Sequence, residues 1–519
     1  MKNRADTLMI QATASDAGKS LFAAALCRIF SRRGIKTVPF KAWNMSLNSY
    51  VTKNGGEIGI AQALQAEAAG REPEVDMQPI LIKAMGDGQT QVIIRGKADK
   101  NIYYSQEKKD YREIFAETIR NSLQKLRQEN DLIIIEGAGS PAEINRSGPD
   151  FANMFTAEIY NSPVLLISNI DRGGALASLV GTLKLLSEKE KKLVQGLLIN
   201  KFRGDFELLK PALGFLKEYT GKEVLGVIPY LKDLNLPEED SASLKKRSQK
   251  NCSNKIKIGI IRLPHISNFS DFNSLKMEAD VYLEYIEKAQ SLNNFDLIII
   301  PGSKTTTKDL DFIKRSGLAA KIKLAAQTGT LIMGICGGFQ MLGRSLYDKH
   351  QTEGGSKKME GLNLLPIDTE FLPDKTTHQV EAVLNNKLEK IEPFSGFDFN
   401  KNLKGYEIHM GITKYLEKSK PLFELQKRSG EKVKIMDGAV DLEGNCIGSY
   451  LHGLFDNDSF RRSLINYLKE KKNLSLNKEK AKSLKNSYHD NLQKELNRLA
   501  DIVESRVDID KLLNLSRRS

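Results

Sequence analysis

The sequence lacks long hydrophobic runs and is poor in aromatic residues. It has 519 residues, of which 7% are aromatic, with a single tryptophan. Its apolar runs are only as long as a strand, far short of the roughly 20 residues that a membrane span needs. A first strand is predicted from residue 7, which leaves no room for a signal peptide before it. We therefore expect a protein that neither crosses a membrane nor carries a leader.

Cysteine is also scarce, and its spacing excludes the common cysteine frameworks. The chain has four cysteines: Cys27, Cys252, Cys336 and Cys446. They are far apart and show no metal-ligand spacing. Disulfide frameworks belong to small secreted domains, whereas thiols stay reduced in the cytosol. The pattern predicts a cytoplasmic protein with reduced thiols.

Positive charge exceeds negative charge, with 78 Lys and Arg against 65 Asp and Glu and a formal net charge of +13. Much of the excess lies in lysine-rich segments and towards the C-terminus, a pattern typical of solvated faces. This net positive charge would suit binding to a nucleic acid, and it would equally suit binding to a polyanionic small molecule. Charge alone does not decide between these partners.

Residues 331–343 have the pattern of a strand, a tight glycine-rich turn and a helix, with Cys336 in the turn. Glycines on both sides permit a turn too tight for Cβ atoms, so the thiol projects above the sheet. Amides at the start of the helix, such as that of Gly337, would stabilise a thiolate and hold an oxyanion. The alternative is a buried cysteine in a glycine-rich turn, but the glycines, Gln340 and His452 favour a nucleophile.

Two further strand ends supply a base and an oxyanion donor for this thiol. His452 comes 116 residues after Cys336, at the end of the predicted strand 447–450. A thiol nucleophile needs a base to deprotonate it and an acid for the leaving amine. The predicted strand 296–300 leads into a turn at Gly302, whose amides would face the cysteine. We predict that Cys336 and His452 are catalytic.

The first 30 residues predict a phosphate-binding loop. A strand at residues 7–11 is followed by a loop ending Gly18-Lys19-Ser20 and then by an apolar-periodic helix. Loop amides cradle phosphates, Lys19 meets the outer phosphates, and the Ser20 hydroxyl can ligate Mg²⁺. The leading glycine of the usual pattern is absent, and a simple helix cap is the alternative. The predicted ATP-binding residues of this loop are Ser15, Gly18, Lys19 and Ser20.

Acidic residues follow several predicted strands, at the edge where parallel sheets bind ligands. Glu136 ends the apolar strand 131–135 and is the predicted partner of Ser20 in holding a metal ion. Glu57 is a candidate for the same metal or its water, or else a surface charge. Asp150 is either catalytic or the cap of the next helix.

Lysine and amide side chains also follow predicted strands. Lys41 is a candidate for holding a substrate carboxylate, or else a surface charge. Asn200 and Lys201 follow a later strand and are predicted to face the nucleotide base, with a polar turn as the alternative. The predicted substrate-binding residues are Lys41, Asn44, Asp150 and Asp171.

Strands and helices alternate through both halves, which predicts an α/β protein with two mainly parallel-sheet domains. We expect a P-loop domain over residues 1–231 and a second α/β domain over residues 256–458. The segment 232–255 has almost no apolar period and is predicted to be a linker. Residues 459–519 are rich in lysine and leucine and are predicted to form a basic helical tail.

These motifs together resemble a known enzyme family over about residues 7–470. The second half is similar to class I (triad-type) glutamine amidotransferases in Pro301-Gly302-Ser303, in Gly334-Ile-Cys336-Gly-Gly-Phe-Gln340 and in Tyr450-Leu-His452-Gly. The first half resembles dethiobiotin synthetase-like ligases in the Lys19 loop and in Glu136-Gly-Ala-Gly. The combination resembles the cobyric acid synthases of the cobalamin pathway, on the segments 39–49, 136–145, 171–174 and 199–205.

The resemblance implies an ATP-dependent, glutamine-hydrolysing amidoligase. The implied substrate is adenosylcobyrinic acid a,c-diamide, of which four side-chain carboxylates become amides, with ATP and Mg²⁺ as cofactors. The implied oxyanion and glutamine-binding residues are Gly302, Gly337 and Gln340. The implied partners are small molecules (a corrinoid polycarboxylate, glutamine and ATP), with no nucleic acid and no membrane.

The sequence departs from the pattern at two positions. Trp43 stands where the family usually has a polar residue. Leu454 stands where many triad amidotransferases carry a glutamate, and the resemblance implies that cobyric acid synthases keep only two members of the triad. We therefore expect that a Cys336–His452 pair suffices, with the imidazole held by packing or by a backbone carbonyl.

Three alternative functions stay open at this point. Two are related amidoligases, a cobyrinic acid a,c-diamide synthase and a cell-wall amidotransferase, which differ in their products. The third is a partition-type P-loop ATPase that binds nucleic acid through its basic surface and carries an inert cysteine domain.

Overall fold

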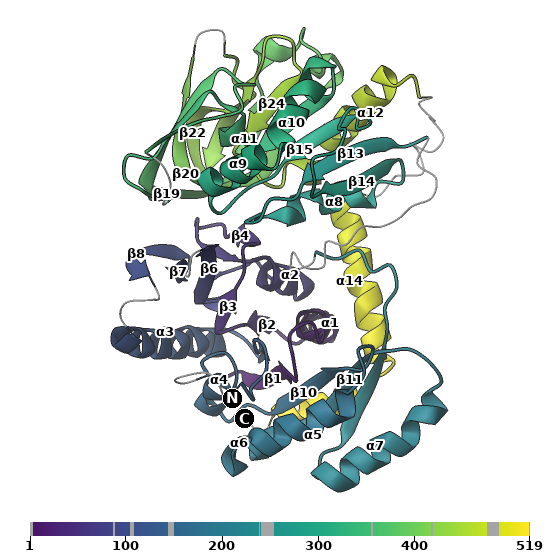
Figure 1. The fold of residues 1–519 in the computed structure, drawn as a ribbon. Helices are drawn as coiled ribbons and strands as arrows, with labels where there is room; N and C mark the ends of the chain where they lie inside the picture. The colour runs from purple at the N-terminus through teal and green to yellow at the C-terminus, as the bar shows by residue number, and fades with distance from the viewer. Residues whose placement is uncertain are drawn as a thin grey trace.

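Two α/β domains, one above the other in Figure 1, make up the chain. The computed structural model describes residues 4–86, 89–103, 108–143, 150–237, 239, 254–353, 357–416, 419–474 and 487–517. Most of the predicted linker, with Cys252, lies outside the described residues. So do Ile144 and Asn145 of the predicted Glu136 segment.

The first domain is built on a six-stranded, fully parallel sheet with the strand order β12-β11-β10-β1-β9-β2. Its strands are β1 (Asp6–Ala12), β2 (Thr37–Phe40), β9 (Leu132–Glu136), β10 (Val164–Asn169), β11 (Val194–Phe202) and β12 (Val224–Pro229). They are nearly continuous apolar runs because helices cover both faces. Ile10 of β1 lies opposite Glu136 of β9. The register therefore brings the loop after β1 and the Glu136 carboxylate to the same edge.

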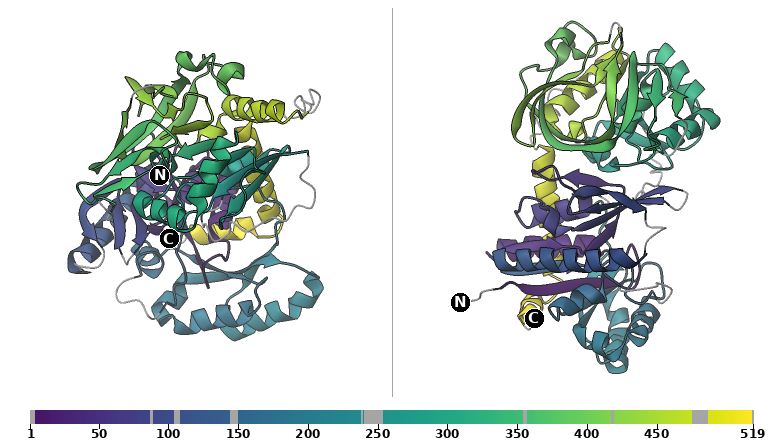
Figure 2. Two further views of the ribbon diagram at one scale, coloured as in Figure 1. Left: turned by 45° about the horizontal axis from the view of Figure 1, so that its top comes forward. Right: turned by 90° about the vertical axis from the view of Figure 1, so that its left-hand side faces the viewer.

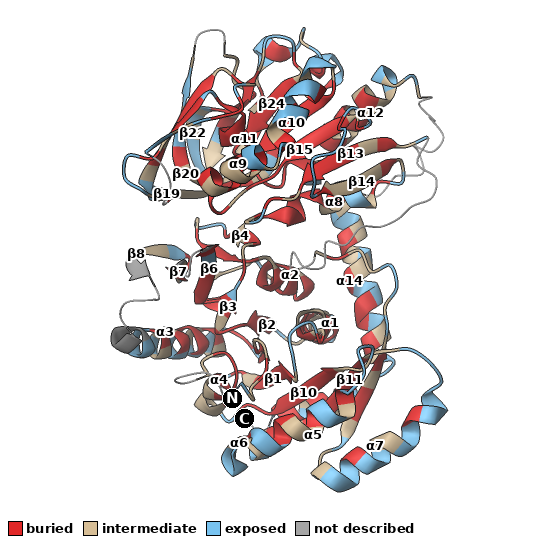
Figure 3. Ribbon diagram, viewed as in Figure 1, coloured by how far each residue is buried: buried red, intermediate tan, exposed pale blue. Residues whose placement is uncertain are grey.

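Helices pack on both faces of this sheet, and the strands between them are buried (Figure 3). The helices of the first half are α1 (Lys19–Arg32), α2 (Ile60–Ala68), α3 (Lys108–Glu129), α4 (Met154–Ile159), α5 (Ala175–Leu185), α6 (Glu188–Leu193) and α7 (Phe206–Thr220). One core contains α1 and α2, and the core on the opposite face contains α3, α4 and α5.

Two small sheets project from the first domain towards the second (Figure 1). One has the order β3-β6-β7-β8, with β3 (Trp43–Met45), β6 (Ile80–Gly86), β7 (Gln89–Ile94) and β8 (Lys97–Tyr103). The other is a hairpin of β4 (Ser49–Val51) and β5 (Glu57–Gly59). Trp43 packs partly buried against the first domain's core.

The second domain has a six-stranded sheet of order β14-β13-β15-β16-β24-β23, parallel except for its last pair. Its strands are β13 (Ile256–Ile261), β14 (Val281–Ile286), β15 (Leu297–Ile300), β16 (Leu331–Ile335), β23 (Ala439–Val440) and β24 (Cys446–Ser449). The helices of this half are α8 (Asn273–Met277), α9 (Thr306–Arg315), α10 (Leu318–Gln327), α11 (Gly337–Leu342) and α12 (Asp458–Lys471).

A mainly antiparallel sheet packs against this parallel one, where the sequence is least regular. Its strands are β17 (Ser345–Tyr347), β18 (Lys358–Glu360), β19 (Ile367–Leu384), β20 (Leu403–Tyr415), β21 (Phe423–Arg428) and β22 (Glu431–Asp437). The predicted α/β class with mainly parallel sheets is confirmed, and the antiparallel sheet adds to it. No helix in the described ranges combines the length and the apolar character that a membrane span needs.

The predicted basic tail divides between the two cores. Helix α12 packs in the core of the second domain. Helices α14 (Tyr488–Glu504) and α15 (Ile509–Ser516) return to the first domain, and α14 runs along α1 (Figures 1 and 2). The domain boundaries 1–231 and 256–458 stay a prediction. We propose that the second domain also includes α12 and that the first also includes α14 and α15.

The packing of α14 follows from an apolar stripe at helical spacing. Its buried residues are Leu492, Leu496, Leu499, Ala500 and Val503. Successive turns of a helix place such residues on one face, and here that face covers α1. An ion pair of 2.8 Å between Arg33 and Glu504 lies at the edge of this contact.

We predict that Leu496→Ala destabilises the protein. The side chain is fully buried, so its truncation should lower the free energy of unfolding by about 3 kcal/mol. Urea denaturation followed by circular dichroism measures this change. The control is Asn497→Ala, an exposed position on the same helix. Equal stability of the two variants would show that α14 does not contribute to the core.

Candidate active site

Cys336 lies in a strained turn between β16 and α11. Its backbone has φ 51° and ψ −107°, a conformation that persists only where the surroundings enforce it. The turn lies close against the neighbouring strand, because a Cβ built on Gly338 would be 1.9 Å from the carbonyl oxygen of Ile300. The other described cysteines, Cys27 and Cys446, are inert by comparison, since burial raises the pKa of both thiols.

His452 is oriented by a carboxylate, which corrects the expectation drawn from Leu454. His452 Nδ1 lies 2.7 Å from Asp271 Oδ2, and the Gly453 N–H donates to Asp271 Oδ1 at 2.9 Å. Asp271 belongs to a short 3-10 helix (Phe269–Phe272) and comes 181 residues before the histidine. The expectation of a two-member site, with the imidazole held by packing or a backbone carbonyl, is therefore wrong. Leu454 is a buried apolar residue in the next turn.

The charge of Asp271 keeps the imidazole protonated near Cys336. Burial lowers the pKa of His452, but the carboxylate of Asp271 and the neighbouring Cys336 raise it to about 10. A protonated imidazole stabilises a thiolate beside it. His452 Nε2 has no hydrogen-bond partner within the described part of the chain, so that nitrogen remains for the thiol and a leaving group.

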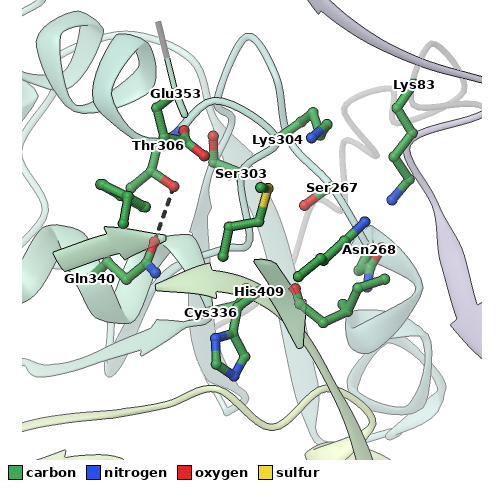
Figure 4. Close-up of a pocket in the computed structure, with 14 residues that line it drawn as sticks. Lys83, Ser267, Asn268, Ser303, Lys304, Thr306, Cys336, Gln340, Glu353 and His409 are labelled. Atoms are coloured by element: carbon green, nitrogen blue, oxygen red, sulfur yellow. Dashed lines mark hydrogen bonds between the residues drawn. The ribbon is translucent and has the colours of Figure 1, made fainter. Parts of the chain in front are cut away.

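A second histidine in the pocket, His409, is already engaged (Figure 4). Its ring stacks on Tyr450 with centroids 3.8 Å apart, and its Nδ1 lies 2.9 Å from the Gly411 carbonyl oxygen. These contacts fix the ring, so His452 remains the predicted base.

The predicted oxyanion and binding residues gather around the thiol. A Cβ built on Gly302 would lie 3.2 Å from His452 Cε1, and one on Gly337 would lie 2.8 Å from the Ser303 amide nitrogen. The two glycines therefore lie on adjacent turns, and Gly302 is beside the imidazole. Gln340 is buried below them, and its Oε1 accepts a hydrogen bond of 3.1 Å from the Thr306 hydroxyl (Figure 4).

The phosphate loop brings Lys19, Ser20 and Glu136 together. Ser20 Oγ donates to Glu136 Oε1 at 2.7 Å, and Lys19 Nζ donates to the Gly139 carbonyl at 3.1 Å. Burial lowers the pKa of Lys19 to about 8, although Glu136 raises it. Lys19 is therefore a buried cation whose charge an incoming phosphate would stabilise.

Asn200 and Lys201 touch the same loop. A Cβ on Gly18 would lie 2.1 Å from Asn200 Nδ2, and Gly18 has φ 97°, so only glycine suits this position. Asn200 Nδ2 donates to Ala17 O at 2.8 Å, and Lys201 Nζ donates to Asp16 O at 2.8 Å. Ser15 is exposed at the top of the loop.

Lys41 and Asn44 lie at the same edge of the sheet as Glu136. Lys41 Nζ is 3.0 Å from Glu136 Oε1, and Asn44 Nδ2 donates to Glu239 at 2.5 Å. Lys41 also lies 3.6 Å from Glu239. Glu239 falls in the predicted linker, and no sequence pattern predicts its place beside Lys41 and Asn44.

The two predicted aspartates differ in position. Asp150 accepts a hydrogen bond of 2.9 Å from Asn153, which also donates to the Ala138 carbonyl, so it lies beside the Glu136 loop. Asp171 is exposed and pairs with Arg203 at 2.7 Å.

Glu57 lies away from Ser20 and Glu136, at the interface of the two domains. Its carboxylate pairs with Lys83 of its own domain and, at 2.5 Å, with Lys375 of the second domain. Burial raises the pKa of Glu57, but the two lysines lower it far more, so the group is a carboxylate with both oxygens engaged. The prediction that Glu57 holds the same metal ion or its water is therefore wrong.

The residues that remain at the phosphate loop fit Mg²⁺. Ser20 and Glu136 offer a hydroxyl and a carboxylate oxygen, the hard ligands that Mg²⁺ prefers alongside phosphates and waters. No cluster of three or more His, Cys, Asp or Glu suited to a metal occurs among the described residues. The loop thus suits an ion held jointly with a nucleotide rather than a protein-only metal centre.

Comparison with known proteins covers both halves. Residues 8–244 match the family model of the CobQ/CobB/MinD/ParA nucleotide binding domain, and residues 257–460 match that of the CobB/CobQ-like glutamine amidotransferase domain. The cobyric acid synthase of Caldanaerobacter subterraneus subsp. tengcongensis is 44% identical over 513 residues, which cover 98% of each chain. Those of Clostridium novyi (strain NT) and Dehalococcoides mccartyi (strain CBDB1) are 44% and 42% identical, over 98% or more of each chain.

The chain belongs to the cobyric acid synthase family. The family is one of biosynthetic enzymes, and its two parts match a nucleotide-binding and an amidotransferase domain. These matches do not favour the alternative hypotheses, which were a partition-type ATPase with an inert cysteine domain and another amidoligase.

Asp271→Asn is predicted to make the Cys336 thiol less reactive. Without the carboxylate the imidazolium loses its stabilisation, so alkylation by iodoacetamide at pH 6 should slow by roughly tenfold or more and recover above about pH 8.5. Mass spectrometry of the Cys336 peptide measures the rate. Asp456→Asn is the control, because Asp456 is exposed and does not orient the imidazole. The same loss in the control would mean that a different carboxylate acts on His452.

Proposed function

We propose that this protein uses glutamine and ATP to amidate four side-chain carboxylates of adenosylcobyrinic acid a,c-diamide, giving adenosylcobyric acid. The observation that carries the proposal is the presence of two sites in one chain. One is a thiol with a carboxylate-oriented histidine, and the other is a phosphate loop with a buried lysine and glutamate. The cobyric acid synthase relatives along the whole chain support the choice of substrate.

The thiol site would release ammonia from glutamine. The Cys336 thiolate attacks the side-chain amide carbon, and the amides of Gly302 and Gly337 stabilise the oxyanion. His452 gives its proton to the leaving nitrogen, so ammonia departs and a thioester remains. Water, deprotonated by the same imidazole, then cleaves the thioester to glutamate and restores the thiol.

The phosphate-loop site would activate a corrinoid carboxylate. Lys19 and the loop amides orient the nucleotide so that a carboxylate oxygen takes its γ-phosphoryl group and ADP leaves. Mg²⁺ held by Ser20 and Glu136 would neutralise charge on the phosphates. Lys41 and Asn44 would hold the substrate carboxylate. Ammonia then displaces phosphate and forms the amide.

Both sites are needed for a physical reason. A carboxylate is a poor electrophile until it is phosphorylated, and free ammonia is scarce and largely protonated at neutral pH. The basic balance of the chain also suits a large polyanion, since its propionate arms are attracted to lysines around the crevice.

The direct test is to incubate the protein with adenosylcobyrinic acid a,c-diamide, ATP, Mg²⁺ and glutamine and to follow the corrinoid by mass spectrometry. We expect partly amidated intermediates that end at four new amides, with ADP and glutamate formed alongside. An unchanged corrinoid, with glutamine still hydrolysed, would assign the enzyme to another acid substrate.

Two substitutions separate the sites. Cys336→Ser should abolish glutamine-dependent synthesis but keep synthesis driven by ammonium chloride, because the activation chemistry lies in the other domain. Lys19→Ala should abolish synthesis with either nitrogen source, since a lysine must meet the charge on the transferred phosphoryl group. Corrinoid amidation and glutamate release are measured in parallel. Loss of both activities in a folded Cys336→Ser variant would contradict this division of labour.

A further inference from the structure

The Cys336 pocket contains three lysines that the proposed thiol chemistry does not use, of which Lys83 and Lys304 are buried and Lys375 is nearly so. Lys304 and Lys375 come from the second domain, whereas Lys83 comes from β6 of the first. The Lys83 side chain is only 4% exposed and reaches the pocket from across the domain interface (Figure 4). A buried ammonium group is costly unless it is paired. Each of these lysines therefore needs a protein partner or a ligand.

Glu57 is the partner of two of them and ties the domains together. Its side chain is 1% exposed and pairs with Lys83 and with Lys375, which belongs to β19. This buried ion triad of Lys83, Glu57 and Lys375 spans the interface. It fixes an ammonium group of the first domain in the catalytic pocket of the second.

Lys304 lacks such a partner. Among the described residues no carboxylate oxygen lies within 4 Å of its ammonium group, and the side chain is buried. Burial and the neighbouring Lys375 lower the pKa of Lys304 to about 7, although Glu353 raises it. The residue follows Ser303 in the turn that carries Gly302, so it stands next to the predicted oxyanion site. An anionic ligand would stabilise its charge.

Glutamine supplies such an anion when its amide lies at Cys336. The amide carbon must contact the thiolate, and the short side chain then places the α-carboxylate within the same pocket. A carboxylate taken from water into this pocket must be paired, or its binding is strongly unfavourable. Among the described residues, Lys304 lines the pocket without a carboxylate partner, and Lys83 lines it with only Glu57, which it shares with Lys375.

We propose that the α-carboxylate of glutamine is bound between Lys304 of the second domain and Lys83 of the first, so that the glutamine site is complete only when the domains are docked. The inference rests on the proposed glutamine chemistry at Cys336 and deepens it. Hydrolysis away from the ligase domain would release ammonia into solvent. A substrate contact that the ligase domain itself supplies restricts hydrolysis to the docked arrangement.

The test compares glutamine with 4-aminobutanamide, which is glutamine without the α-carboxylate. Glutamate or 4-aminobutanoate release gives kcat/KM for each amide, and no corrinoid is needed. The ratio of the two kcat/KM values should fall about tenfold or more in Lys83→Met and in Lys304→Met, because only glutamine loses a buried ionic contact. Glu57→Gln should lower the ratio less, and Lys83→Arg should restore part of it.

The matched control is Lys349→Met, which removes an exposed lysine that pairs with Glu370 on β19 and should leave the ratio unchanged. Equal losses for both amides in Lys83→Met would overturn the proposal, since they would show a structural role alone. A fall only in Lys304→Met would also overturn it, because the second domain would then bind the carboxylate unaided. Failure of the corrinoid test, with the ratio behaving as expected, would count against the proposed product and not against this site.

Discussion

The docking of the β4–β5 hairpin against β19 and β20 is the contact on which both sites depend. Tyr406 of β20 donates to the Ser49 carbonyl at 3.1 Å, and its ring stacks on His452 with centroids 5.2 Å apart. Asn268 accepts from the Ser49 N–H at 3.1 Å, three residues before Asp271. The hairpin of the first domain thus packs against the residues that hold the His452 imidazole of the second.

The same short segment of chain also reaches the phosphate loop. It begins at Lys41, which pairs with Glu136, and ends at Glu57, which pairs with Lys375. Buried pairs of this kind contribute little net stability, but the loss of one partner leaves an uncompensated charge. The segment from Lys41 to Glu57 therefore carries one buried ion pair at the phosphate loop and another at the domain interface.

Local patterns in the sequence were enough for the fold class and for the residues that lie within one turn. The glycines around Cys336 and the Gly18-Lys19-Ser20 loop each specify a strand, a turn and a helix with no distant partner. Asp271 could not be found in this way, because its link to His452 spans 181 residues and depends on how β13 and β24 lie in the sheet. Glu57 was predicted to hold the metal ion, but its carboxylate pairs with Lys83 and Lys375 at the domain interface. The sequence around an acidic residue does not reveal which domain its carboxylate faces.

The position of Asp271 explains why the site tolerates Leu454. A carboxylate orients an imidazole if it meets Nδ1 and leaves Nε2 towards the thiol, and the chain segment that supplies it is not constrained. Asp271 meets this requirement and also accepts from the Gly453 N–H, so it fixes both the ring and the turn that carries it. A glutamate two residues after His452 would compete for the same nitrogen. An apolar Leu454 instead fills the core beneath the turn, and the task of orienting the base passes to the segment that also contacts the first domain.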